Sequence, residues 1–120
     1  MLRAAALVAI LFLVSSCGTP TREEAVGLSD EYSSYEVGVG EPTLTIHAIV
    51  GNESCWTGHD LRVEETADTV VVELIAHRRT DVDFCEAEGV FYDHTVTLEE
   101  PLGGRVVMDA TSREPVAMRD

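Results

Sequence analysis

Alternation of apolar and polar residues dominates the chain from residue 41 onward. In TLTIHAIV (residues 43–50), TVVVELIAHRR (69–79) and VFYDHTVTLEE (90–100), every second residue is aliphatic or aromatic and many are β-branched. This period of two is typical of half-buried strands. The expected inward-facing residues are Leu44, Ile46, Ala48, Val50, Val70, Val72, Leu74, Ala76, Val90, Tyr92, Val96 and Leu98.

Shorter runs at Leu61–Glu64, Arg105–Met108 and Pro115–Met118 complete six or seven strands, and turn residues separate them. Glycine, asparagine and proline in these intervals favour tight chain reversals. No amphipathic helical pattern accompanies the strands. The sequence therefore predicts an all-β fold, a small antiparallel β-sandwich (Ig-like) or a partly open barrel.

The N-terminus has a different pattern. Met1–Arg3 is a short positive region, and Ala4–Val14 is uninterrupted by polar residues before Ser15 and Ser16. This order is typical of a secretory signal. A membrane-spanning helix needs about 20 apolar residues, so the run is too short for an anchor.

Val14-Ser15-Ser16-Cys17 resembles the lipobox of bacterial lipoproteins: an aliphatic residue, two small residues and a cysteine. The resemblance implies that the Cys17 thiol receives a diacylglycerol with fatty acyl chains such as palmitate, and that cleavage makes Cys17 the first mature residue. The protein would then be fixed to the cell membrane by lipid, facing outside the cytoplasm. The alternative is ordinary signal cleavage, which leaves Cys17 as a free or paired thiol.

Three segments follow from these patterns. Residues 1–16 are expected to be the lipoprotein signal peptide, residues 17–40 the lipidated cysteine and a flexible tether, and residues 41–120 the β-sandwich domain. Within the tether, which is rich in serine, glycine and glutamate, Tyr32, Tyr35, Val37 and Val39 form a weak candidate for a first strand.

Charge excludes one class of partner. The chain has 22 acidic and 8 basic residues and a formal net charge of −14. Because nucleic acids and anionic lipid headgroups both require positive charge on their partners, nucleic-acid binding is not expected. An acidic surface keeps a membrane-tethered domain soluble.

The three cysteines are Cys17, Cys55 and Cys85. If Cys17 carries lipid, an even pair is left, and in an exported protein such a pair predicts a disulfide. We expect Trp56 to pack against this bridge. The alternative is a zinc site, which would draw its ligands from Cys55, His59, His77, Cys85 and His94.

A second resemblance covers about residues 51–116. Two cysteines surround a valine-rich hairpin, followed by the pattern L-x-x-P-L-G-x-R-x-V-x-D at Leu98, Pro101, Leu102, Gly103, Arg105, Val107 and Asp109. This is similar to a group of small, uncharacterised actinobacterial lipoproteins or secreted proteins. The resemblance implies a β-rich domain without known activity, and it carries no catalytic residues over to this chain.

Motifs for catalysis were not found: the chain contains no G-x-S-x-G, phosphate-binding glycine loop or H-E-x-x-H. DVDFCEAEG (residues 81–89) lacks the EF-hand order, which leaves a looser calcium site at Asp81, Asp83, Glu86 and Glu88 as an alternative to a solvated acidic loop. We therefore expect no catalytic residues, no cofactor and no enzymatic activity.

The expected function is that of a non-enzymatic envelope lipoprotein, a binding or structural module. The alternative is an envelope zinc-binding protein with cysteine and histidine ligands. Candidate binding loops are residues 56–60, with Trp56, His59 and Asp60, and the loop with Asp81, Asp83 and Glu86. Besides the membrane at Cys17, the partner would be an envelope protein or cell-wall component. Arg105 and Asp109 are assigned architectural roles, Arg105 by pairing with a carboxylate of a neighbouring strand.

Overall fold

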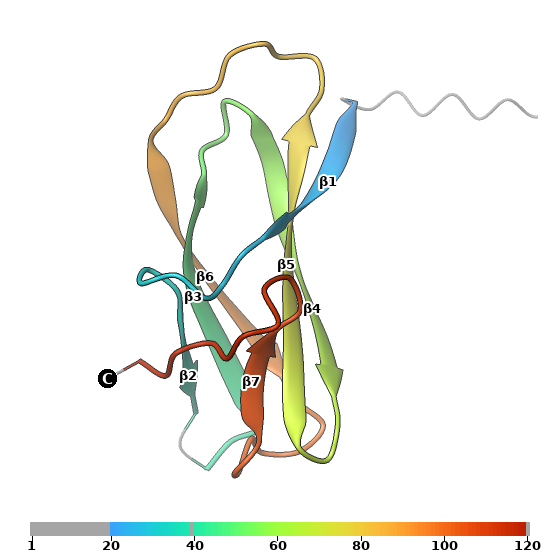
Figure 1. Cartoon of the computed structure of the whole chain (residues 1–120), viewed down its shortest axis with the longest axis vertical. Helices are drawn as coiled ribbons and strands as arrows, with labels where there is room; N and C mark the ends of the chain where they lie inside the picture. Colours follow the sequence, from blue (N-terminus) through green and yellow to red (C-terminus); the bar gives the residue numbers. More distant parts are fainter. Residues whose placement is uncertain (1–19, 39, 120) are drawn as a thin grey trace, which may run out of the picture.

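The computed structural model describes residues 20–38 and 40–119, and their seven strands form two sheets (Figure 1). The expected lipidation site, Cys17, lies outside these residues. The strands are β1 (Thr21–Val26), β2 (Ser34–Val37), β3 (Thr43–Gly51), β4 (Trp56–Glu65), β5 (Thr69–Arg79), β6 (Gly89–Thr97) and β7 (Val106–Asp109).

One sheet is built around β5, the longest strand. β4 pairs antiparallel with one edge of β5, while the other edge is shared: β1 pairs antiparallel with its C-terminal half and β7 pairs parallel with its N-terminal half. The second sheet has the order β2-β3-β6, with both pairings antiparallel. Because the described strands lie in two separate sheets, the predicted sandwich is confirmed, with β5 and β7 as the one parallel pair among the described strands.

The core lies between the two sheets, as the alternation predicts. The four expected inward residues of β3 are buried, and so are the four of β5. Residues outside these strands complete the core: Leu28, Leu98, Leu102, Val107 and Val116. Burial of this continuous apolar surface is the main favourable term in folding.

The outer strand β6 only partly follows the prediction. Tyr92 and Val96 pack against the core while remaining half-buried, and Val90 is exposed. β6 pairs with β3 alone and is therefore an edge strand. The alternation gave the right parity, but the start of the strand has no opposing side chains that would cover Val90.

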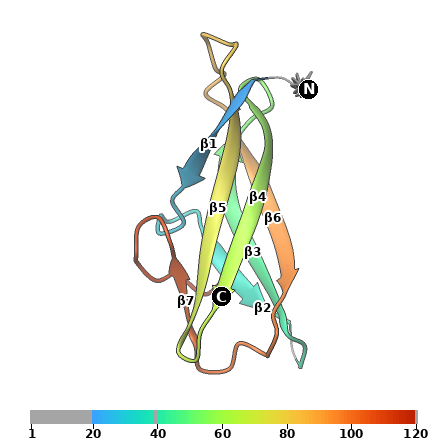
Figure 2. The same cartoon turned by 90° about the vertical axis from the view of Figure 1, so that its right-hand side faces the viewer.

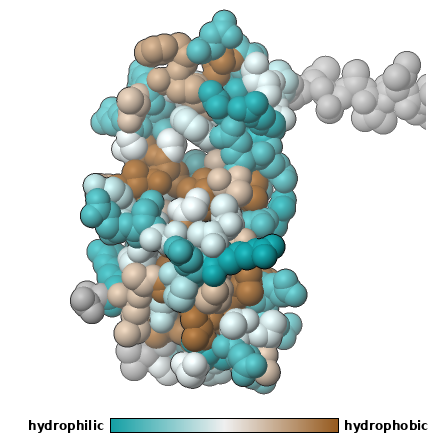
Figure 3. Space-filling model, in the orientation of Figure 1, coloured by the Kyte–Doolittle hydropathy of each residue, from teal (hydrophilic) through white to brown (hydrophobic). Residues whose placement is uncertain are grey.

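Two irregular segments cross one side of the sandwich, between the edges formed by β7 and β2. The first connects β1 to β2 and buries Leu28, whose amide donates to the fully buried carboxylate of Asp109 over 2.8 Å. The second, after β7, buries Val116 and reaches β2, where the Tyr35 amide donates to the carbonyl of Ala117 over 2.9 Å. Hydrophobic residues remain visible on this face in the middle and lower part of the molecule (Figure 3).

Asp109 explains how these segments are held. Besides the Leu28 amide, its carboxylate accepts the amides of Thr111 (3.1 Å) and Ser112 (3.3 Å). A buried carboxylate needs such donors to offset its desolvation. The architectural role expected for Asp109 is confirmed. The strand expected at Pro115–Met118 is reduced to two isolated bridges, Met108↔Pro115 and Tyr35↔Met118.

The structure differs from the expected flexible tether over residues 17–40. β1 and β2 occupy much of its described part, and Leu28 and Ser33 are buried. The side chains of β1 are mostly polar and exposed, because its position depends on backbone pairing with β5. Backbone pairing leaves no hydrophobic pattern in a sequence, so the strand could not be predicted from alternation.

Candidate functional site

The predicted disulfide is confirmed: Cys55 and Cys85 are bonded, with their Cα atoms 5.5 Å apart. Cys55 is fully buried, at the turn between β3 and β4, and Cys85 lies in the connection from β5 to β6. The bond joins these two loops at one end of the sandwich, here called the disulfide end. A disulfide of this kind indicates a location outside the cytoplasm.

Polar contacts also fasten the two loops. The Asn52 amide donates to Glu86 over 3.3 Å, and the backbone amide of Glu86 donates to the Ser54 hydroxyl over 3.2 Å. Asp81 contacts the guanidinium of Arg79 at 3.1 and 3.2 Å, and this hydrogen bonding lowers the pKa of the Asp81 carboxyl. Glu86 thus joins the loops, Asp81 is paired, and Asp83 is exposed.

Trp56 is held between a glycine and an arginine. A Cβ atom on Gly51 would come within 2.3 Å of the indole, so the ring needs a glycine at this position. The Arg78 guanidinium lies 5.8 Å from the ring centroid, contacts Cys85 Sγ at 3.6 Å and contacts Glu24 of β1 at 3.5 Å. Arg78 therefore links the half-buried Trp56 to the disulfide and to β1.

The expected binding loop at residues 56–60 is instead part of strand β4, which corrects the placement of Trp56, His59 and Asp60. A register shift between Trp56 and Gly58 interrupts the pairing with β5. Such an irregularity changes which face later side chains take. As a result, His59 is half-buried and contacts Tyr92 of the opposite sheet, while Asp60 is exposed.

His59, Tyr92 and His94 line the side of the sandwich on which β4 and β6 are the edge strands (Figure 2). The His59 and Tyr92 rings are 5.3 Å apart, and Tyr92 stacks on His94 at 5.9 Å. The Tyr92 hydroxyl lies 3.0 Å from Nδ1 of His94. Next to His59 and Tyr92 is a hollow of about 280 Å³, also lined by Trp56 and Phe91. We call this the β4–β6 hollow.

His59 is the unusual member of this group. Its Nε2 atom is buried and has no hydrogen-bond partner among the described residues. Burial lowers the pKa of the His59 imidazole, repulsion by His77 lowers it further, and Asp60 acts in the opposite direction. Burial likewise raises the pKa of Tyr92. The hollow thus offers aromatic surface and one unpaired neutral imidazole.

His77 and His47 contact carboxylates. Nε2 of His77 lies 2.6 Å from Asp60, and this hydrogen bond is the main cause that lowers the Asp60 pKa. His47 lies between two carboxylates, with Nδ1 2.5 Å from Asp93 and Nε2 2.7 Å from Glu36.

Metal ligands are not brought together. The sulfurs of Cys55 and Cys85 are bonded to each other, which removes both thiolates from the expected zinc set. Within residues 20–38 and 40–119, no three His, Cys, Asp or Glu side chains form a group suited to a metal ion. This applies to the zinc set with His59, His77 and His94 and to the acidic loop with Asp81, Asp83, Glu86 and Glu88.

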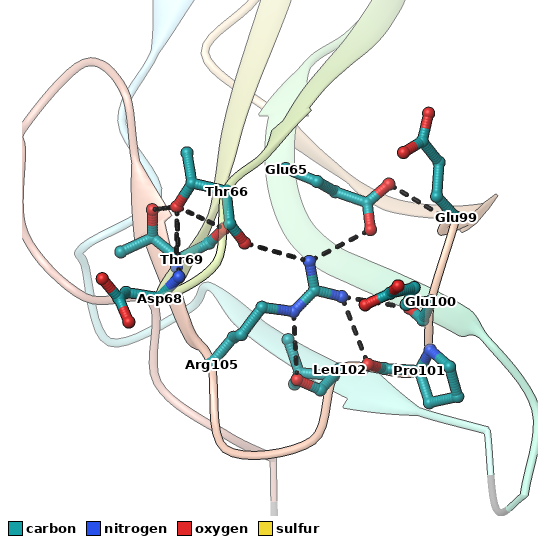
Figure 4. A network of polar contacts seen from close by, with 9 residues as sticks. All are labelled: Glu65, Thr66, Asp68, Thr69, Glu99, Glu100, Pro101, Leu102 and Arg105. Carbon is teal, nitrogen blue, oxygen red and sulfur yellow. Dashed lines mark hydrogen bonds and ion pairs between the residues drawn. The ribbon is translucent and has the colours of Figure 1, made fainter.

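At the opposite end of the molecule, Arg105 is held by a dense set of acceptors (Figure 4). Its Nη1 atom lies 3.1 Å from Glu65, the side chains being only 12% and 15% exposed. The guanidinium also donates to the carbonyls of Thr66, Glu100, Pro101 and Leu102. Arg105 pairs with a carboxylate, as expected, but Glu65 belongs to β4, which is separated from β7 by β5. The contacts of Arg105 fix the loop before β7. The end of the sandwich that contains this loop is here called the Arg105 end.

The Glu65 carboxylate accepts hydrogen bonds from a backbone amide as well as from Arg105. The pKa of its carboxyl is lowered mainly by a hydrogen bond from the Glu99 amide, which is 2.8 Å long, and then by Arg105. The carboxylate thus joins the end of β4 to the loop after β6. Arg105 and Glu65 together connect the end of β4, the loop after β6 and the loop before β7.

A substitution of His59 should change how stability depends on pH. As the pH falls below about 6.5, the ordinary pKa of histidine, unfolded chains bind a proton at this position that the folded protein takes up only at lower pH. His59 therefore makes wild-type stability decline on acidification. The free energy of unfolding, measured by urea at pH 8 and pH 5, should differ less in His59→Gln than in wild type. An equal difference in both proteins would contradict this.

Comparison with known proteins does not place the chain in a family. No protein-family model, curated protein or solved structure matches it. The similarity to actinobacterial lipoproteins stays a prediction. In the part of the chain that the structure describes, no helix has the length and apolar character to cross a membrane.

Proposed function

We propose that this chain is a bacterial envelope lipoprotein, anchored to the membrane through lipid on Cys17, and that its sandwich is a non-enzymatic binding or structural module. The observation that carries the proposal is the pairing of the cysteines. Because Cys55 and Cys85 are bonded, Cys17 is the remaining cysteine, and it stands directly after the apolar run and two serines. This is the position that lipidation requires.

The setting of the histidines supports a non-enzymatic role. His77 and His47 contact carboxylates, and His94 contacts a tyrosine. In residues 20–38 and 40–119, no serine, threonine or cysteine side chain hydrogen-bonds a histidine ring. A hydroxyl or thiol paired with a histidine is one common way in which enzymes activate a nucleophile.

The β4–β6 hollow is the best-supported binding site for a partner on the sandwich. Trp56 and Tyr92 provide large apolar surfaces, and their aromatic side chains lose little conformational freedom when a ligand binds. Pockets for small ligands commonly combine these features. An envelope protein or a cell-wall component remains the proposed partner.

Counting free thiols tests this proposal against its alternatives in one measurement. The full chain is extracted from bacterial membranes in detergent, denatured without reductant and with a metal chelator, and reacted with a thiol reagent. The proposal predicts no free thiol, because Cys17 carries a thioether and Cys55 is bonded to Cys85. One free thiol would contradict lipidation of Cys17, and two free thiols released together with zinc would favour the zinc-binding alternative.

A further inference from the structure

Pro20, the first residue that the structure describes, is hydrogen-bonded to the disulfide end. The carbonyl of Pro20 accepts hydrogen bonds from the amide of Thr80 (2.9 Å) and from its hydroxyl (3.2 Å). Pairing of β1 with β5 starts at the next residue, with Thr21 opposite Arg79. Figures 1 and 2 show the start of β1 beside the end of β5 and the connection to β6.

The chain between Cys17 and this attachment is very short. Only residues 18 and 19 separate Cys17 from Pro20. Three steps of 3.8 Å between Cα atoms allow a separation of at most about 11 Å. Acyl chains on Cys17 would hold that residue at the membrane surface. Pro20, at its attachment to Thr80 of the disulfide end, would then lie within about 11 Å of Cys17, whatever path the linking residues take.

Exposed apolar side chains gather at this same end. Phe84, in the disulfide-bonded connection, is 83% exposed, and Phe91, near the start of β6, is 86% exposed. Ile49 is opposite Phe91 in the β3–β6 register, and Val90 is next to it; both are partly exposed. Exposed apolar groups beside a bilayer gain free energy when they enter its interface.

Carboxylates surround these apolar side chains. Glu53, Asp83 and Glu88 are exposed in the two loops, in addition to Asp81, which is paired with Arg79. Carboxylates repel anionic headgroups, and dissolved salt shortens the range of this repulsion. The charge pattern therefore fits a lipid surface of zwitterionic headgroups better than an anionic one.

We infer that the disulfide end is a lipid-facing surface, which contacts the headgroup region through Phe84 and the neighbouring apolar side chains. The inference rests on the proposed lipidation of Cys17. It adds an orientation: the Arg105 end points away from the membrane, and the β4–β6 hollow, which Phe91 and Val90 also line, lies beside the lipid-facing surface. The expected long tether would have left the orientation free.

Tryptophan quenching by labelled lipids tests this orientation. Lipidated full-length protein with Trp56→Phe receives either Phe84→Trp or, as a matched control in the β4–β5 turn, Ala67→Trp. Both proteins are placed in phosphatidylcholine vesicles with bromine on the acyl chains near the headgroups. We expect the emission of the Phe84→Trp protein to fall by roughly half, since interfacial side chains reach about 5–10 Å into the boundary. The emission of the Ala67→Trp protein should be unchanged.

Each other outcome is informative. If both proteins float with the vesicles and are quenched equally or not at all, the lipid-facing surface is refuted while lipidation stands. If neither protein floats with the vesicles, the proposed lipidation fails and the inference fails with it. Should Trp56→Phe prevent folding, Phe84→Trp and Ala67→Trp are each compared with wild type in the presence of Trp56.

A second version of the quenching experiment varies the charge of the lipids. In vesicles rich in phosphatidylglycerol, quenching of the Phe84→Trp protein should be weaker at low salt and should recover at high salt, because screening removes the repulsion. Stronger quenching on anionic vesicles at low salt would contradict the role given to the carboxylates.

Discussion

Replacing Cys17 by serine should move the protein out of the membrane fraction or leave an uncleaved precursor. Serine has no thiol to accept a diacylglycerol, and the apolar run before it is too short to span a bilayer. Two or more acyl chains make membrane attachment effectively permanent, so their loss is expected to have an all-or-none effect. Fractionation of cells that express the full chain, followed by detection of the protein, measures this.

The matched control removes the other two cysteines. A Cys55→Ala/Cys85→Ala chain keeps Cys17 and should stay with the membrane, because lipidation depends on the N-terminal sequence and not on the disulfide. A Cys17→Ser protein that is processed normally and still partitions into the detergent phase would rule out lipid attachment at this residue.

Removing the disulfide should have the largest effect on stability. The bond joins residues 30 positions apart, and on the chain-entropy model closure of such a loop stabilises the fold by about 3.5 kcal/mol. For a domain of this size, that loss lowers the melting temperature by roughly 15–25 °C. The expected result for Cys55→Ala/Cys85→Ala is thus a folded but much less stable protein, measured by thermal unfolding followed with circular dichroism.

Reduction of the wild-type protein should reproduce this loss, while Cys17→Ser, which leaves the bond intact, should melt like wild type when both are compared in the same detergent. If the double substitution lowers the melting temperature by only a few degrees, the polar contacts of Asn52, Ser54 and Glu86 hold the two loops without the bond. The entropic account of the disulfide would then be wrong.

The strands with strict alternation were predictable from sequence, and the reason is physical. β3 and β5 each bury one face, so every second residue in their sequences is apolar. β1 contributes backbone hydrogen bonds to the edge of β5 while its side chains remain mostly polar and exposed. Backbone pairing does not require alternating apolar side chains. For this reason β1 was predicted to belong to a flexible tether.

The candidate site was partly predictable. The inward parity of Tyr92 and His94 could be read from β6, whereas the irregular pairing after Trp56 concealed that His59 would meet Tyr92. Cysteine number and the export pattern were sufficient to predict the Cys55–Cys85 bond. The role of Arg105 followed from its motif, but its acceptors, mostly backbone carbonyls, appear only in the structure.

The short link between Cys17 and Pro20 changes the expected mode of action. A long tether would have left the orientation of the sandwich relative to the membrane free. With Pro20 hydrogen-bonded to Thr80, the disulfide-bonded loops would lie next to the membrane and the β4–β6 hollow beside them, whereas the Arg105 end would be the part most accessible to an envelope partner.

The mass of the mature N-terminus tests the central claim most directly. Protein purified from bacterial membranes is digested, and its most N-terminal peptide is identified by mass spectrometry. The account predicts a peptide that begins at Cys17 and carries the added mass of a diacylglycerol. A peptide that begins elsewhere, or an unmodified Cys17, would contradict it.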